Sequence, residues 1–542
     1  MSNAAALAAI LTLGLSLRGQ APKGEVVLRS TTRLVQVNVI VQDKKGDPVA
    51  DLKKENFQIL DRGKLQQVSL FSVESNAALP SVDRKLPPNV FTNTLSQRAG
   101  TPASVTVILL DALNTKFEDQ AYAKAQIVKF LQTIKPEDRV ALYALGRGLR
   151  VLHDYTTDSS ELLRRLAAYR GENLPDVAAS EPSSMSDTDG LQLDSWLRGS
   201  GGNQAEADFY MVNRIQGTLR AIEFIAAHLA KLPGRKNLIW VSGGFPLTIG
   251  FDDIGDARSP GREQRTFSQE IDRTVRAVND ANLAIYPVDA RGLVADARFS
   301  AANRRIDLTP KLSPGPVVEH QETMRELANR TGGRAYYNTN DLKNAIRDAI
   351  QDSRVTYTLG FYPKAESFDG KFHDLKVKID RPGLNVRYRK GYFDLAEQPQ
   401  DAKTRNTELR DAVWSPLDAT GLGLIVNIQT AETPDSLDLF IRMDPRAISL
   451  QTQKDRWVGR LDLLFVQKND RGKQFNGMND TVELNLLEPS YRTLQKEGLV
   501  YRKKIALAPE ASLLRVVVRD APSGTLGSVT VPINQIARSV AK

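Results

Sequence analysis

The chain has 542 residues, of which 41% are hydrophobic and 25% are charged. This length exceeds what one hydrophobic core supports and predicts about three globular domains. The 73 basic residues outnumber the 64 acidic ones only slightly and form no basic stripe, which argues against nucleic-acid binding. The absence of cysteine excludes disulfides, thiolate nucleophiles and cysteine-containing metal sites.

An apolar run at residues 4–17 resembles the hydrophobic region of a secretory signal. Gly19 and Ala21 follow it with the spacing of a cleavage site, so residues 1–21 are predicted to be a signal peptide. No basic residue precedes the run, and a disordered or helical tail is the alternative. Because no segment reaches the roughly 20 apolar residues that cross a bilayer, we expect no transmembrane span. We therefore expect an exported protein that is periplasmic, secreted or at the cell surface.

Residues 25–74 are predicted to form a small β unit. The valines at 35, 37, 39 and 41 alternate with polar residues, and two further strand patterns follow with a turn between them. A unit of about 50 residues is only marginally stable as an independent domain, because it buries little apolar surface. Three strands without intervening helices are expected later, within 354–393, and we expect them to complete this unit. Polar, proline-containing stretches at 75–103 and 394–408 predict linkers.

Residues 104–353 predict an α/β domain. An apolar strand at 105–111 ends in Asp111, and further strands are expected at 140–145, 238–241 and 283–288, with amphipathic helices between them. This alternation predicts a doubly wound, mainly parallel sheet, with an antiparallel edge strand at 149–155. Residues 409–542 contain six alternating strand patterns and predict a C-terminal β-sandwich. The predicted fold class is therefore α/β plus β, a central sheet flanked by β-sandwich-like domains.

Three long segments with few regular signals, 171–210, 246–269 and 291–320, should emerge at the same edge of the sheet as Asp111. Loops of this length are more often functional or disordered than neutral. The first is acidic and is either a solvated insertion or a mobile lid or partner-binding loop that presents Trp196.

The β-α-β order, the Leu-Leu-Asp111 strand end and the helix that carries Thr218 resemble the Rossmann-like von Willebrand factor A fold. The segments 46–57, 232–246 and 391–393 resemble more narrowly the VWFA-related proteins abundant in Acidobacteria. This resemblance covers most of residues 30–393. It implies an exported protein of no established enzymatic activity, built around an A-type domain.

In the A-type family, Asp-x-Ser-x-Ser and residues from two neighbouring loops hold a divalent metal and leave one position for an acidic partner. The resemblance implies Asp111, Thr115 and Thr218 as ligands of Mg²⁺ or Mn²⁺, with Ser242 as a further possibility. Leu113 and Gly243 replace two family ligands, and Asn114, Ser242 or Asp252-Asp253 are the residues that could compensate through water. The alternative is that Asp111 caps the following helix or turn, with Asn114 and Thr115 as local hydrogen-bonding residues.

These observations favour a non-enzymatic binding or adhesion-type protein with a degenerate metal-dependent adhesion site. Its partner would be an unidentified protein or an envelope polysaccharide, bound at an edge made of Asn114, Gly243, Gly244, Asp252, Asp253 and Trp196. One alternative is a metal-free structural or assembly factor of the cell envelope. Another is a phosphoaspartate-type hydrolase, but Leu113 occupies the position of the second aspartate, which serves as general acid in that chemistry. We predict no catalytic residue.

Overall fold

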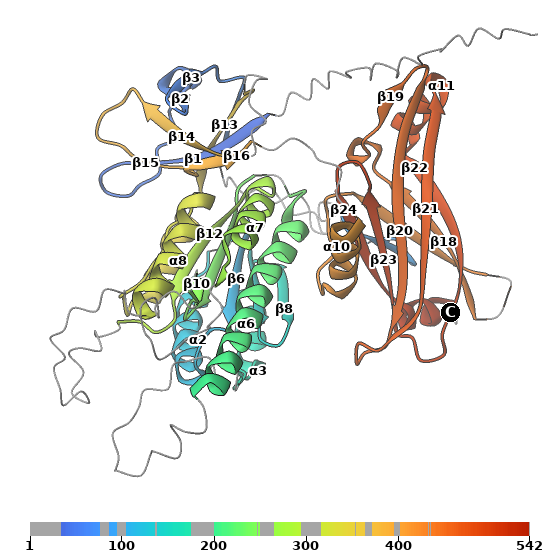
Figure 1. Cartoon of the computed structure of the whole chain (residues 1–542), viewed down its shortest axis with the longest axis horizontal. Helices are drawn as coiled ribbons and strands as arrows, with labels where there is room; N and C mark the ends of the chain where they lie inside the picture. The colour runs from blue at the N-terminus through green and yellow to red at the C-terminus, as the bar shows by residue number, and fades with distance from the viewer. Residues whose placement is uncertain are drawn as a thin grey trace, which may run out of the picture.

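The computed structural model divides the chain into three parts (Figure 1). A central α/β domain has a small N-terminal β unit at one end and an elongated C-terminal β domain beside it. The expected signal peptide, residues 1–21, lies outside the described residues. The described residues are 34–75, 86–94, 105–135, 138–174, 200–232, 234–246, 248–249, 265–293, 316–352, 354–363, 371–394, 402–431, 433 and 435–540.

The sheet of the central domain has five strands in the order β12-β9-β6-β7-β8. Four of them run parallel, and the last closes one edge antiparallel to β7. Every residue of the parallel strands is buried, which explains their continuous apolar sequences, because such strands are covered on both faces. The predicted α/β fold is confirmed. The strands are β6 (Val105–Asp111), β7 (Val140–Leu145), β8 (Leu149–Thr156), β9 (Lys236–Ser242) and β12 (Leu283–Asp289).

Helices pack on both faces of this sheet. One face contacts α2 (Phe117–Leu131), α3 (Ser159–Ala168) and α9 (Leu342–Gln351). The other contacts α6 (Ser200–Leu229), α7 (Ser268–Asp280) and α8 (Pro316–Thr331), seen side by side in Figure 1. A short hairpin of β10 (Thr248–Ile249) and β11 (Arg265–Thr266) precedes α7.

Helix α6 begins earlier than the sequence suggested. Residues 171–210 were expected to form one long loop, but α6 starts at Ser200. The reason is that the apolar face of the helix extends one turn further back: Ala207 is buried, and Met211, four residues later, packs on the same core as Ile215. Residues 200–210 of this segment therefore belong to a helix.

The N-terminal β unit is built from two stretches of chain far apart in sequence. β13 lies between β1 and β4, and β14 lies between β2 and β16. Apolar side chains from both stretches form one shared core. The strands are β1 (Val35–Gln42), β2 (Phe57–Asp61), β3 (Lys64–Gln66), β4 (Leu70–Ser75), β13 (Val355–Phe361), β14 (Phe372–Ile379), β15 (Asn385–Arg387) and β16 (Gly391–Phe393).

Two sheets enclose a common apolar core in the C-terminal domain. One has the order β22-β18-β17-β5, and the other has β19-β20-β23-β24 with β21 also paired to β20. The elements are β5 (Val90–Thr92), α10 (Ala402–Trp414), β17 (Leu424–Thr430), β18 (Ser436–Met443), β19 (Gln451–Gln453), β20 (Arg456–Lys468), β21 (Gln474–Leu487), α11 (Glu488–Glu497), β22 (Leu499–Ala506), β23 (Leu513–Asp520), β24 (Leu526–Pro532) and α12 (Ile533–Val540).

Both predicted linkers contribute to this domain, which corrects their assignment. β5 lies inside 75–103 and pairs with β17, although three residues are too few to give an alternating pattern. α10 begins inside 394–408, and its buried residues Ala412 and Val413 pack against Val517 of β23.

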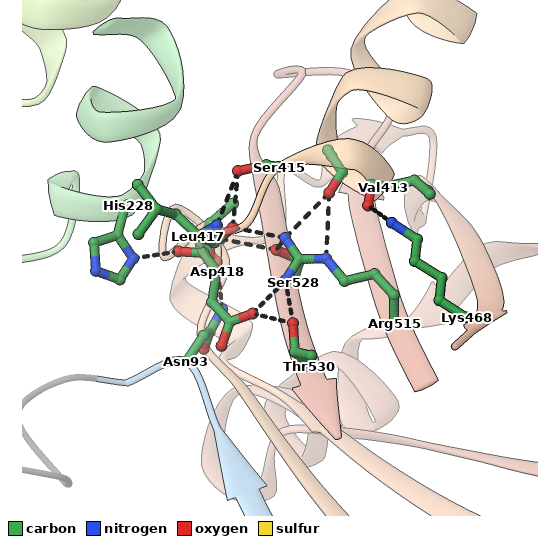
Figure 2. Close-up of polar contacts among 12 residues, drawn as sticks. Asn93, His228, Val413, Ser415, Leu417, Asp418, Lys468, Arg515, Ser528 and Thr530 are labelled. Atoms are coloured by element: carbon green, nitrogen blue, oxygen red, sulfur yellow. Dashed lines mark hydrogen bonds and ion pairs between the residues drawn. The ribbon is translucent and has the colours of Figure 1, made fainter. Parts of the chain in front are cut away.

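The central and C-terminal domains meet where α6 ends (Figure 2). His228 Nδ1 lies 2.7 Å from the carbonyl oxygen of Asp418, and the Thr420 backbone N–H donates to the carbonyl of Ala227 at 3.1 Å. Buried Arg515 holds the same segment from the other side, since it donates to the Leu417 carbonyl at 2.6 Å and contacts Asp418. The joint is therefore a hydrogen-bonded contact.

Among the described helices, none has the length and apolarity needed to cross a membrane.

Candidate functional site

Asp111 ends the central strand β6 and is 2% exposed. Its carboxylate accepts four hydrogen bonds. Oδ2 accepts from Asn114 Nδ2, Trp240 Nε1 and Ser242 Oγ, each at 2.8 Å, and Oδ1 accepts from the Asn114 backbone N–H at 3.1 Å. Burial raises the pKa of Asp111, and these donors oppose the rise because they stabilise the charged form. The carboxylate is therefore held by protein groups on both oxygens.

The side chain of Asn114 connects Asp111 to helix α6. Its amide nitrogen also donates to Thr218 Oγ1 at 2.6 Å, and its amide oxygen accepts from Arg214 Nε at 3.3 Å. Thr218 donates in turn to the carbonyl of Arg214 at 2.9 Å. The positive charge of Arg214, which is itself buried, also lowers the pKa of Asp111. A guanidinium therefore lies near Asp111, in the part of the fold where the family resemblance implied a metal.

The turn after β9 packs directly on the segment after β6. The Gly243 backbone N–H donates to Thr115 Oγ1 at 3.0 Å, and the Gly244 N–H donates to Ser242 Oγ at 2.9 Å. A Cβ atom on Gly243 would lie 2.5 Å from the backbone oxygen of Asn114. Gly243 is therefore required for this close approach. The hydroxyl of Thr115 is used as the acceptor for the Gly243 N–H of the turn.

Two further ionisable groups lie at this edge that the sequence did not single out. Asp289 ends β12 and is buried. Its carboxylate accepts hydrogen bonds from Arg291 Nε at 2.9 Å and from Arg291 Nη2 at 2.8 Å. The position at a strand end was the signal that could have found it. His320 lies on α8 against Gly244, and burial together with the charges of Arg291 and Arg214 lowers its pKa to about 3. His320 is therefore neutral at physiological pH.

The predicted metal ligands come together only in part. Asp111 and Ser242 are in direct contact, Thr218 is linked to them through Asn114, and Thr115 is bonded to Gly243. A cavity with room for about one water molecule touches Asp111 and Thr115, but most of its other lining side chains are apolar. Within the described part of the chain, no three histidine or acidic side chains are arranged to hold a metal ion. The arrangement offers few free oxygen ligands for an ion such as Mg²⁺, which prefers six.

The residues expected to form a partner-binding edge are placed differently. Asn114, Gly243 and Gly244 are buried, because the two loops pack on each other and on α8. Asp252, Asp253 and Trp196 lie outside the described residues. The described segments at this edge instead present exposed apolar side chains: Phe117, Phe209, Leu293 and Tyr337.

Comparisons with protein-family models and with curated proteins find no match. Among solved structures, an aerotolerance-related membrane protein from Bacteroides fragilis is 13% identical, over 46% of this chain and 98% of that chain, with a TM-score of 0.24. The SpRpn10 VWA domain is 13% identical, over 45% of this chain and 93% of that chain, with a TM-score of 0.20. A von Willebrand factor type A structure from Catenulispora acidiphila is 9% identical, over 64% and 80% of the two chains, with a TM-score of 0.25. The solved structures similar to this chain thus include von Willebrand factor type A domains.

Proposed function

We propose that this protein is an exported, non-enzymatic binding or assembly protein whose central domain recognises a macromolecular partner without a metal ion. The domain would be a doubly wound sheet of von Willebrand factor A type between two β-sandwich-like parts. The partner, a protein or an envelope polysaccharide, would bind at the edge where the parallel strands end. The hydrogen bonds of the degenerate adhesion site around Asp111 would hold the loops at that edge in place.

One observation carries the metal-free part of the proposal, namely that the Asp111 carboxylate already accepts four hydrogen bonds from protein donors. A metal would have to displace donors such as Trp240 and Ser242, which are themselves buried. A buried donor without an acceptor costs about 1–3 kcal/mol, so each displacement opposes metal binding. Arg214 adds electrostatic repulsion against a divalent cation.

The first test compares thermal unfolding of the full chain in millimolar Mg²⁺ or Mn²⁺ with unfolding in EDTA. A ligand at a hundredfold excess over its Kd stabilises a fold by about 2.7 kcal/mol. We expect the curves to overlay. A saturable rise in melting temperature that disappears in Asp111→Asn would contradict the metal-free proposal and support the metal-dependent alternative.

The second observation is that apolar side chains are exposed in the segments that follow the strand ends at the same edge. Phe117 begins the helix after β6 and is 54% exposed, and Leu293 follows β12 and is 65% exposed. Exposed apolar side chains at an edge are the kind of contact that a partner could cover. They support this edge as the contact region.

The test of the partner site is capture from envelope extracts by the immobilised full chain. We expect capture to persist in EDTA and to be lost in the double variant Phe117→Ser/Leu293→Ser. Leu65→Ser is the matched control, because Leu65 is 67% exposed but lies on β3 of the N-terminal β unit. Capture that fails equally in the control, or that requires a divalent metal, would refute the assignment.

The non-enzymatic part of the proposal is supported by the surroundings of Asp111. A phosphoaspartate hydrolase needs an accessible carboxylate nucleophile and a neighbouring general acid. Asp111 is buried and bonded, and Leu113 packs in the apolar core. We expect no turnover of an aryl phosphate. Turnover that is abolished in Asp111→Asn would overturn this expectation.

A further inference from the structure

A small polar cavity lies at the opposite edge of the central sheet, where the N-terminal β unit meets it. It has room for about one water molecule or one small ion. The N-terminal β unit contributes side chains from β1 and from the segment after β15, and the central domain contributes the starts of β9 and β12. The lining residues are Gln36, Asn38, Arg235, Asn279, Asn282, Leu283, Thr331 and Arg389.

The cavity contains the guanidinium of a buried arginine. Arg235 is 3% exposed, and its Nη2 donates to the hydroxyl of Tyr286 at 3.0 Å and to the carbonyl of Gly332 at 2.6 Å. Both acceptors are neutral. Its Nε is also buried and has no acceptor among the described residues. A buried charge is unfavourable unless it is paired, so an anion beside the Arg235 guanidinium would stabilise it.

The other polar side chains around the cavity offer donors as well. Arg389 brings a second guanidinium, and its Nη2 donates to the backbone carbonyl of Gln36 at 2.7 Å. The amide oxygens of Gln36 and Asn38 accept from Asn282 Nδ2 at 3.4 Å and from Thr358 Oγ1 at 3.0 Å. Since each oxygen is engaged, the amide nitrogen of each side chain is the group that can donate to a bound anion. Asn279 uses its amide nitrogen elsewhere, since Nδ2 donates to the carbonyl of Arg330 at 3.2 Å. The lining therefore combines the guanidinium donors of Arg235 and Arg389 with side-chain amides.

The charged residues that line this cavity are both basic. None of its lining residues is acidic. The carboxylate nearby is Glu74 on β4, and it interacts with Lys236 and with the backbone N–H of Arg235.

We propose that this cavity binds one small inorganic anion of the halide class. The two guanidinium groups supply the charge and the amide nitrogens supply further donors, while the small volume excludes larger organic anions. Because the lining comes from two parts of the chain, the anion would join the N-terminal β unit to the central domain. The proposal is independent of the partner-binding edge and of any metal at Asp111.

The experiment measures thermal unfolding of the full chain in sodium chloride and in sodium gluconate at equal ionic strength. Gluconate is too large for the cavity, and equal ionic strength matches the screening of surface charges. We expect a saturable rise in melting temperature with chloride only. Gln36→Glu would place a carboxylate among the same donors, and we expect it to unfold at the chloride-saturated temperature of the wild type in either salt.

The matched control is Gln58→Glu, which adds the same charge on β2 at an exposed position away from the cavity and should keep the chloride dependence. Equal melting of the wild type in both salts would overturn the proposal, as would an unchanged chloride dependence in Gln36→Glu. Crystals of the wild type soaked in bromide give a second readout that needs no variant. An anomalous peak beside Arg235 supports the site, and a water molecule there refutes it.

Discussion

Gly243 is the residue whose replacement should disturb the Asp111 edge most directly. In Gly243→Ala, the new methyl group would lie 2.5 Å from the backbone oxygen of Asn114, which cannot rotate away. The loops after β6 and β9 would have to separate, and overpacking of this kind costs about 1–3 kcal/mol. We expect urea denaturation to show a loss of that size in the free energy of unfolding.

Gly148→Ala is the control for this change, because a Cβ at Gly148 meets no atom within 4 Å. Its stability should match the wild type within a few tenths of a kcal/mol. Equal stability of the two variants would show that the loops are not in the close contact described here.

The residues around Asp111 differ in how far the sequence could predict them. Asp111 and Ser242 could be brought together because carboxyl ends of parallel strands share an edge. Trp240 was missed, although residues two apart on a strand point to the same face and Ser242 was already identified. Arg214 was missed as well, although it lies four residues before Thr218 on one helix. The direction of the Asn114 amide, which decides whether Asp111 has a free oxygen, has no sequence signal.

Secondary-structure elements were predictable where their pattern is long enough to read. The parallel strands of the central sheet were found because each is a continuous apolar run between helical patterns. β5 was not found, because it has three residues and its partner β17 lies more than three hundred residues later. Pairing over such a separation depends on the whole fold and leaves no local pattern.

Asn93, which follows β5, gives a test of that element. It is fully buried, donates to the carbonyls of Ala419 at 2.7 Å and Leu422 at 2.8 Å, and accepts from the Leu424 N–H at 2.7 Å. Asn93→Ala would leave these buried groups without partners, so we expect a loss of more than about 2 kcal/mol in the stability of the C-terminal domain. Hydrogen exchange of β17 measures it.

Asn479→Ala on β21 is the matched control, because Asn479 is exposed in the same domain. Its exchange rates in β17 should equal those of the wild type. Unchanged protection of β17 in Asn93→Ala would mean that the segment at 86–94 is not anchored there, and that its assignment as a linker was correct.

On the scale of the whole molecule, the two flanking parts contact the central domain away from the Asp111 edge. The N-terminal β unit lies at the edge where the parallel strands begin, and the C-terminal domain contacts the end of α6 (Figures 1 and 2). Phe117 and Leu293, in described segments at the edge where the parallel strands end, are both exposed.

The contact between the N-terminal β unit and the central sheet should depend on pH through Lys236. Burial lowers the pKa of Lys236 to about 7, while Glu74 partly opposes this. Between pH 7 and 10, Lys236 therefore binds fewer protons in the folded protein than in the unfolded chain, so its contribution to the free energy of unfolding rises with pH. For one titrating group, the free energy of unfolding changes by on the order of 1 kcal/mol per pH unit within this window.

The double variant Lys236→Met/Glu74→Gln removes both buried groups. We expect its advantage in free energy of unfolding over the wild type to be largest at pH 7 and to shrink toward pH 10, as measured by urea denaturation at each pH. Lys473→Met/Glu510→Gln is the control, because this pair, 3.6 Å apart, is exposed, and its difference from the wild type should stay constant over the same range. If the buried-pair variant also differs from the wild type by a constant amount, then Lys236 keeps its proton in the folded protein. Its positive charge would then have to be balanced by Glu74 at the contact between the two parts.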